Sequence, residues 1–159
     1  MFSGAGPGKW QMENGDLKLL QEKIGYLFKD ESILNQAVTH SSYAYESRQK
    51  DITDNGRLEF FGDSVLGFVI SEYLLKGSPG MSEGDLTRQR ALIVNRDSLS
   101  KRARELDMPQ YLLLGRGEEK TGGRQNATNL AGVLEALIAA VYFDGGLEEA
   151  RRFITRVIL

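Results

Sequence analysis

The chain has 159 residues, of which 41 % are apolar, and this is enough for one domain with one hydrophobic core. It contains no cysteine and a single histidine, His40, which excludes disulfides, zinc–thiolate sites, iron–sulfur clusters, a cysteine nucleophile and multi-histidine metal sites. Because no apolar run approaches about 18 residues and the N-terminus has no signal-like pattern, we expect a soluble, cytoplasmic domain with no membrane partner.

The net charge of −2 conceals an uneven distribution along the chain. Residues 1–87 carry a net charge of −5, residues 88–124 carry +4, and residues 125–159 carry −1. Two ordinary solvated faces would explain this division. A basic track beside an acidic site, as an enzyme acting on a polyanion would need, would explain it as well.

Helical periodicity runs through almost the whole chain, with no strand pattern and no internal repeat. Residues 1–15 are rich in glycine and polar side chains, and we expect a flexible lead-in there, followed by one domain over residues 16–159. Helices are expected to follow the capping residues Asp16, Asp30, Asp54 or Asn55, Ser82, and Asn126 or Thr128. They are expected to cover about 17–27, 31–38, 56–76, 83–94, 96–106, 128–143 and 147–159. The sequence predicts an all-α fold.

Glycine and proline mark the breaks between these helices. The breaks are expected at 77–80, 109, 115–125 and 144–146. In the segment 115–125, glycines would let the backbone approach a phosphate closely, and Arg116, Lys120 and Arg124 add positive charge.

Three carboxylates stand in helices that are otherwise apolar. Glu59 and Asp63 are spaced i, i+4 in the segment 58–75, and Glu135 stands in the segment 125–150. Neither segment contains a lysine or an arginine. Burying an unpaired carboxylate costs several kcal/mol, so these side chains need a partner from elsewhere or access to water.

Three arrangements would satisfy these carboxylates. They could face solvent along a narrow stripe, pair with an arginine from elsewhere in the fold, or converge on a divalent cation. Oxygen ligands without histidine or cysteine suit Mg²⁺. A Mg²⁺ ion held in this way can activate water and stabilise charge on a phosphate, which permits hydrolysis without a protein nucleophile.

Five segments resemble one known family in order and spacing. Residues 57–66, RLEFFGDSVL, resemble the signature helix of the ribonuclease III family, usually written ERLEFLGDSVL. The other matching segments are THSSY at 39–43, EGDLTR at 83–88, GEEKTGG at 117–123 and LEALI at 134–138. The chain is therefore similar to the ribonuclease III endonuclease domain over about residues 17–158.

This resemblance implies a homodimeric, Mg²⁺-dependent endoribonuclease, with Mn²⁺ as a substitute metal and no small-molecule cofactor. The implied substrate is double-stranded RNA, gripped by its shape and backbone and cut to products with 5′-phosphates and short 3′ overhangs, in ribosomal and messenger RNA processing. Glu59, Asp63 and Glu135 match metal-site carboxylates of the family. Asp63 and Glu135 match the pair on which catalysis most depends.

The resemblance and the charge pattern also suggest RNA contacts. Glu83 matches an acidic position near the RNA groove. The basic candidates are Arg88, Arg116, Lys120 and Arg124, although ion pairing with nearby acids is the ordinary role of arginines at helical spacing. Family members usually continue into a double-stranded-RNA-binding domain, so we expect weaker and more salt-sensitive binding by this part alone.

Two glycines replace carboxylates of the family pattern. The second acidic helix normally reads D-x-x-E, and the aspartate position is Gly132 here. The signature helix normally opens with glutamate, and that position is Gly56. Loss of the acid at 132 implies weaker metal binding and reduced cleavage. An alternative is therefore a catalytically silent dimer that binds structured RNA as a scaffold or assembly factor.

Other residues have both a structural and a functional interpretation. His40 is expected to hydrogen-bond near a helix end rather than to act in catalysis. Gly62 and Gly67 are candidates for close helix packing. The resemblance implies a dimer contact at Phe60, Phe61 and Gly62, and ordinary core packing is the alternative for the two phenylalanines.

Overall fold

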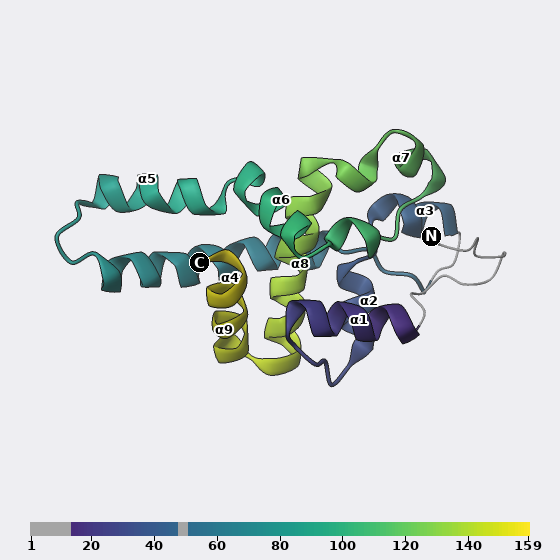
Figure 1. The fold of residues 1–159 in the computed structure, drawn as a ribbon, viewed down its shortest axis with the longest axis horizontal. Coiled ribbons are helices and arrows are strands. Elements are labelled where there is room, and N and C mark those ends of the chain that lie inside the picture. The colour runs from purple at the N-terminus through teal and green to yellow at the C-terminus, as the bar shows by residue number, and fades with distance from the viewer. Residues whose placement is uncertain (1–13, 48–50) are drawn as a thin grey trace.

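The computed structural model describes residues 14–47 and 51–159 as a helical domain (Figure 1). In chain order the elements are α1 (Asn14–Ile24), α2 (Glu31–Ala37), α3 (Ser41–Ser47), α4 (Gly56–Gly77), α5 (Glu83–Val94), α6 (Arg96–Glu105), η1 (Met108–Gln110), α7 (Arg116–Lys120), η2 (Gly123–Gln125), α8 (Ala127–Gly145) and α9 (Leu147–Ile158). No strand occurs in the described ranges, where an isolated parallel bridge joins Thr39 and Leu113. The predicted all-α class is confirmed.

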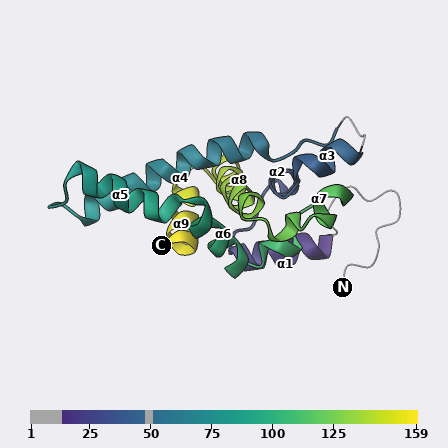
Figure 2. The ribbon, with the colours of Figure 1, turned by 90° about the horizontal axis from the view of Figure 1, so that it is seen from above.

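Helix α8 forms the centre of the domain. Every residue from Leu130 to Val141 is buried except Glu135, which is half-buried. Helix α4 runs across α8, and α2, α6 and α9 pack around it; α8 is seen nearly end-on in the middle of Figure 2. By length and composition α8 could cross a membrane, but a core helix passes the same test and most of α8 is buried inside the protein.

Helices α4 and α8 approach each other most closely at Gly62. A Cβ atom at this position would overlap the backbone carbonyl of Glu135, so only glycine fits. At Gly67, by contrast, an added Cβ would meet nothing within 4 Å. The prediction of close packing is therefore confirmed for Gly62 and wrong for Gly67. The crossing at Gly62 places Glu135 directly beside α4.

A helical hairpin projects from this body. Helix α4 extends beyond the core and the chain returns along it as α5, as Figures 1 and 2 show. None of the residues of α5 is buried. Arg90 Nη1 donates to Ser71 Oγ at 2.9 Å and so links the two helices. Ser82 caps α5 as predicted, because its hydroxyl accepts the Asp85 N–H at 3.2 Å.

The first helix differs from its prediction. Asp16 lies in the first turn of α1 rather than before it, because the helix already includes Asn14. Gly25 has a φ of 64°, which ends the helix and leaves Leu27 75 % exposed. The flexible lead-in predicted for residues 1–15 lies, up to residue 13, outside the described residues.

Three further elements, α3, α7 and η2, were not predicted, and α3 supplies the cap of α7. Helix α3 forms just after His40, and α7 and η2 lie within the segment expected to be a loop. The Glu46 carboxylate at the end of α3 accepts the N–H groups of Arg116 and Gly117, at 2.8 and 3.1 Å. The first turn of α7 is thus capped by a side chain about 70 residues away, which local sequence does not indicate.

The caps predicted for α2 and α8 are confirmed. Asp30 accepts the Ser32 N–H at 2.9 Å, and Asn126 accepts the Thr128 N–H at 2.8 Å. Helix α8 continues two residues further than predicted, and Gly146, with a φ of 85°, ends it.

Candidate active site

The crossing of α4 and α8 brings three of the predicted carboxylates close enough for their charges to shift the pKa values of Glu59 and Glu135. Glu59 and Asp63 lie one turn apart on α4, and Glu135 faces them from α8. Burial, together with the charges of Asp63 and Glu59, raises the pKa of Glu135 to about 7. Burial also raises the pKa of Glu59; the nearby carboxylates add to this effect, and His40 opposes it.

None of these carboxylates forms an ion pair with a lysine or arginine of the described residues. The predicted alternative of an arginine partner is therefore wrong for that part of the chain. Asp63 is exposed, as the solvent-stripe alternative expects, but Glu59 and Glu135 are half-buried. Two of the three groups are thus partly removed from water without a lysine or arginine partner, and only Glu59 has His40 nearby as a partial compensation.

The donor set fits a hard divalent cation. Within residues 14–47 and 51–159, no three acidic or imidazole side chains already stand close enough to coordinate one ion. The three carboxylates nevertheless offer only oxygen ligands, burial and their own charges raise the pKa values of Glu59 and Glu135, and none is paired with a lysine or arginine of the described residues. Mg²⁺ retains several waters and needs few protein carboxylates, so an open set of this kind suits it. Glu59, Asp63 and Glu135 are the residues that could hold it.

Gly132, where the family pattern has an aspartate, lies opposite the Glu59 side chain. A Cβ atom at position 132 would stand 2.7 Å from Glu59 Oε2. Gly132 also lies one turn before Glu135 on the same face of α8. The place of the missing acid is therefore bordered by carboxylates from two helices.

Gly56, the second departure, lies against another carboxylate. Its N–H donates to Asp54 Oδ1 at 3.0 Å, and a Cβ there would stand 3.3 Å from the same oxygen. The Asn55 side chain donates instead to the Ala37 carbonyl at 3.1 Å and does not cap α4. Burial is the main cause of the raised pKa of Glu59, and the charge of Asp54 adds to it, whereas His40 lowers it. Sequence reasoning missed Asp54 as a neighbour of the site and treated it as a helix cap only.

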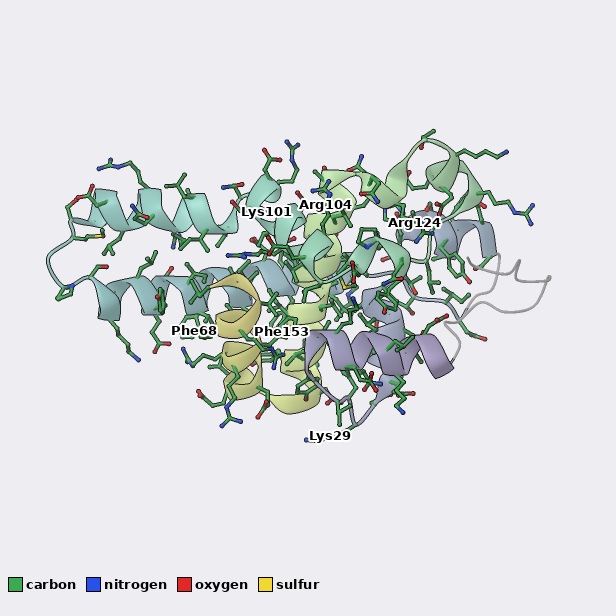
Figure 3. All side chains as sticks on the ribbon, in the orientation of Figure 1. Lys29, Phe68, Lys101, Arg104, Arg124 and Phe153 are labelled. Atoms are coloured by element: carbon green, nitrogen blue, oxygen red, sulfur yellow. The ribbon has the colours of Figure 1, made fainter. Side chains whose placement is uncertain are left out.

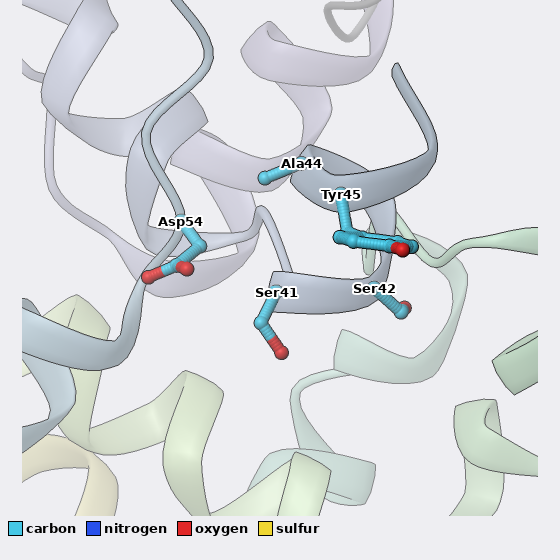
Figure 4. Close-up of a pocket in the computed structure, with 5 residues that line it drawn as sticks. All are labelled: Ser41, Ser42, Ala44, Tyr45 and Asp54. Atoms are coloured by element: carbon cyan, nitrogen blue, oxygen red, sulfur yellow. The ribbon is translucent and has the colours of Figure 1, made fainter. Parts of the chain in front are cut away.

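An open pocket of about 590 Å³ adjoins this end of the site. Figure 4 shows the residues around it, which are Ser41, Ser42, Ala44, Tyr45 and Asp54. His40 precedes this pocket, and its Nδ1 lies 2.8 Å from the hydroxyl of Ser42, which accepts the Gly115 N–H at 2.9 Å. His40 therefore has the structural hydrogen-bonding role that the sequence predicts.

The structure does not bring Glu83 to the three carboxylates within one subunit. Glu83 begins α5 at the tip of the projecting hairpin, and about 20 Å of helix separates Asp63 from Gly77 at the end of α4. Arg88, on the same helix, pairs with Asp85 at 2.6 Å, which is the ordinary role of an arginine at this spacing.

The basic residues of 115–125 fall into two groups. Arg124 donates to the Leu112 carbonyl at 3.0 Å and to the Glu119 carboxylate at 2.8 Å, so it ties this segment together. Arg116 and Lys120 on α7 form no ion pair with the residues that the structure describes. These two side chains are the better candidates for contact with a polyanion.

Helix α6 adds basic side chains near the same edge of the molecule. Figure 3 shows Lys101, Arg104 and Arg124 along the upper side of the domain, over α6 and η2. Arg104 donates to the Gln125 carbonyl at 3.0 Å and joins α6 to η2. Some basic residues of the segment 88–124 therefore hold elements of the fold together, and others remain on the surface where a polyanion could contact them.

Comparison with known proteins identifies the family. The family model described as Ribonuclease-III-like matches residues 30–159. The chain is 52 % identical, over 141 residues, to the protein named Ribonuclease 3 from Bacillus cereus strain AH820 and to that from Bacillus anthracis. The chain belongs to the ribonuclease-III-like family. These alignments cover 89 % of the chain and 58 % of each relative, so it spans little more than half of their length.

Solved structures show which part of ribonuclease III the chain represents. Two structures of the ribonuclease III nuclease domain from Campylobacter jejuni superpose with a TM-score of 0.82 at 37 % identity. They cover 89 % and 92 % of this chain, which covers 95 % of each of them. One is described as showing structural flexibility in a region involved in dimer formation. The resemblance found in the sequence is confirmed, and the chain corresponds to the nuclease domain of its ribonuclease III relatives.

Proposed function

We propose that this domain is a Mg²⁺-dependent endoribonuclease that hydrolyses double-stranded RNA. The observation that carries the proposal is the electrostatic coupling of Glu59, Asp63 and Glu135 at the crossing of α4 and α8, where none of them forms an ion pair with a lysine or arginine of the described residues. Membership of the ribonuclease-III-like family supports the reaction class. We place the enzyme in the cytoplasm, where it would process ribosomal or messenger precursors.

The three carboxylates have different positions in this proposal. Half-buried Glu59 and Glu135 lie at the base of the site, and exposed Asp63 faces the solvent from which the RNA backbone approaches. These residues would hold Mg²⁺, or Mn²⁺ in its place, which when bound would supply positive charge to stabilise the developing phosphate anion and to activate water. Water attacks phosphorus and the bond to the 3′ oxygen breaks. The products are a 5′-phosphate and a 3′-hydroxyl, with one proton transferred overall from the water to the leaving oxygen.

We assign RNA binding to charged side chains on the surface of the domain, which would face the phosphate backbone of the RNA. Arg116 and Lys120 would contact phosphates directly, because neither forms an ion pair with the described residues, although the Glu46 carboxylate is near enough for both charges to lower its pKa. Arg88 and Arg124 would have to share their existing contacts with the RNA. Glu83, on the projecting hairpin, would meet the duplex away from the cut. Recognition of this kind reads duplex shape and phosphate rather than base sequence.

The proposal includes a homodimer formed through the start of α4. Phe60 is 78 % exposed and Phe143 is 56 % exposed, and with Phe61 they line a pocket of about 480 Å³ beside Arg57 and Leu58. Exposed apolar patches of this kind commonly mark interaction surfaces. A second copy is the partner that the Campylobacter relative suggests.

Product analysis tests this function. The purified protein is incubated with a fully paired RNA duplex and Mg²⁺, and the ends of the products are identified. We expect short duplexes with 5′-phosphates from the parent, none from Asp63→Asn, and parental products from Glu22→Gln, which removes an exposed carboxylate on α1. Intact RNA at high enzyme concentration, with the parent indistinguishable from Asp63→Asn, would contradict the proposal.

The glycines at 56 and 132 favour a second candidate, a silent dimer that binds structured RNA as a scaffold. Binding without cleavage would support it, and Mg²⁺-dependent products with 5′-phosphates would remove it. A Gly132→Asp variant assayed beside the parent shows whether the glycine at this position reduces the cleavage activity. A large gain in cleavage identifies a weakened metal site, and no gain over a robust parental activity shows that three carboxylates suffice.

A further inference from the structure

We infer that Gly132 provides the space in which the Glu59 carboxylate reaches from α4 onto α8, so that Glu59 takes the place of the acid missing at this position. Gly132 is thus a positioning residue for Glu59. This inference rests on the proposed function, because it concerns how that metal site is assembled in this chain.

Position 132 is packed against the carboxylate of Glu59. A Cβ atom added at position 132 would stand 2.7 Å from Oε2, 2.9 Å from Cδ and 3.1 Å from Oε1 of Glu59. All three nearest atoms belong to that one carboxylate. Any side chain at 132, even the methyl group of alanine, therefore excludes the present position of Glu59.

The backbones of α4 and α8 cross closely beside this contact, at Gly62. Gly62 removes the side chain that would hold α4 away from α8, and the Glu135 backbone fills that space. Gly62 lies three residues after Glu59 on α4, and Gly132 lies three residues before Glu135 on α8, so both glycines belong to the same contact. One glycine lets the backbones approach, and the other lets the Glu59 side chain cross.

The chemical consequence is that the carboxylate above position 132 comes from α4. An aspartate on α8 would be fixed by its own helix, whereas Glu59 reaches the place through a longer and more flexible side chain. Filling position 132 should therefore lower metal affinity even when the added group is chemically inert. Glycine inside a helix costs up to about 1 kcal/mol relative to alanine, so the same change should not destabilise the fold.

The test measures Mn²⁺ binding to the whole chain by electron paramagnetic resonance of free Mn²⁺, together with thermal unfolding of the metal-free protein. We expect Gly132→Ala to weaken Mn²⁺ binding roughly tenfold and to leave the unfolding temperature equal or higher. Glu59→Gln should weaken binding to a similar extent. The double variant should bind no more weakly than Glu59→Gln alone, because both changes remove the same ligand. Gly67→Ala, the same substitution in open space on α4, should leave the affinity unchanged.

Several results would overturn the inference. They are parental affinity in Gly132→Ala, additive losses in the double variant, an equal loss in Gly67→Ala, and a loss of affinity in Gly132→Ala accompanied by lower thermal stability. If the parent itself binds no Mn²⁺, the proposed function fails and the inference fails with it. Binding by the parent without a response to Gly132→Ala removes the inference alone.

Discussion

Glu135 is the carboxylate of the candidate site whose ionised form the fold destabilises most. It is the only residue between Leu130 and Val141 that is not buried, and its pKa is raised to about 7 by burial and by the charges of Asp63 and Glu59. The folded protein therefore holds a proton on Glu135 more tightly than the unfolded chain does. The stability from this group is fully present below about pH 4.5 and is lost as the pH rises to about 7.

Glu135→Gln should consequently stabilise the metal-free protein above neutral pH. The ionised carboxylate costs of order 2 kcal/mol at pH 8, and glutamine removes this cost while keeping the size of the side chain. Urea unfolding at pH 5 and pH 8 measures the difference between variant and parent, which should be larger at pH 8. A difference independent of pH, or one reproduced by Glu22→Gln, would contradict the assignment.

Two arginines of one segment should behave in opposite ways. Arg124→Ala should lower the free energy of unfolding by about 1–3 kcal/mol, since it leaves the carbonyl of Leu112 without its donor. Arg116→Ala should leave unfolding unchanged and weaken duplex RNA binding, with a salt dependence reduced by about one unit of slope. Denaturant unfolding and RNA titrations at several salt concentrations check both, and a stability loss in Arg116→Ala would speak against its role as a surface contact.

At the residue scale, the sequence was sufficient where the signal is local. A charged residue in an apolar helix is visible in any window of the chain, so Glu59, Asp63 and Glu135 could be named without a structure. The contact of Glu59 with Gly132, and the closeness of Asp54 to Glu59, depend on packing between segments far apart in the chain. No local pattern contains that information.

At the element scale, the crossing of α4 and α8 decides where the site lies. Capping residues correctly predicted the starts of α2, α5 and α8, because Asp30, Ser82 and Asn126 act on backbone groups two or three residues away. Helix α7 was missed because Glu46 caps it from α3.

Gly62→Ala should be strongly destabilising. Its methyl group would overlap the Glu135 carbonyl and force α4 from α8, at a cost of about 2–4 kcal/mol. Gly67→Ala on the same helix meets nothing within 4 Å and should stabilise the protein by up to about 1 kcal/mol. Chemical denaturation compares the pair, and equal effects in the two variants would show that the crossing is looser than described.

At the scale of the whole molecule, the fold class and the family followed from the sequence, because the helical periodicity and the order of five motifs extend over nearly the whole chain. The sequence did not show which basic residues of 88–124 hold the fold together and which are available to a partner. Residues 88–124 are spread over the projecting hairpin, α6, α7 and η2, and part of their charge holds these elements together. The proposed RNA-binding surface is therefore smaller than the charge count suggests.

The apolar patch at the start of α4 predicts self-association. The parent should sediment as a dimer at micromolar concentration, and Phe60→Ser should shift it towards the monomer, since Phe60 is 78 % exposed in the single subunit. Leu27→Ser is the control, because Leu27 is 75 % exposed outside the patch. Equal dissociation of both variants, or a monomeric parent, would contradict the assignment of this surface.

The central claim is that the carboxylates at the crossing of α4 and α8 hydrolyse duplex RNA with Mg²⁺. The most direct measurement is the single-turnover rate of cleavage of an end-labelled RNA duplex across a Mg²⁺ titration, for the parent and for Glu135→Gln. The account predicts a parental rate that rises and saturates with Mg²⁺, and a rate lower by roughly 100-fold or more in the variant with RNA binding retained. A parental rate independent of Mg²⁺, or equal rates in both proteins, would contradict it.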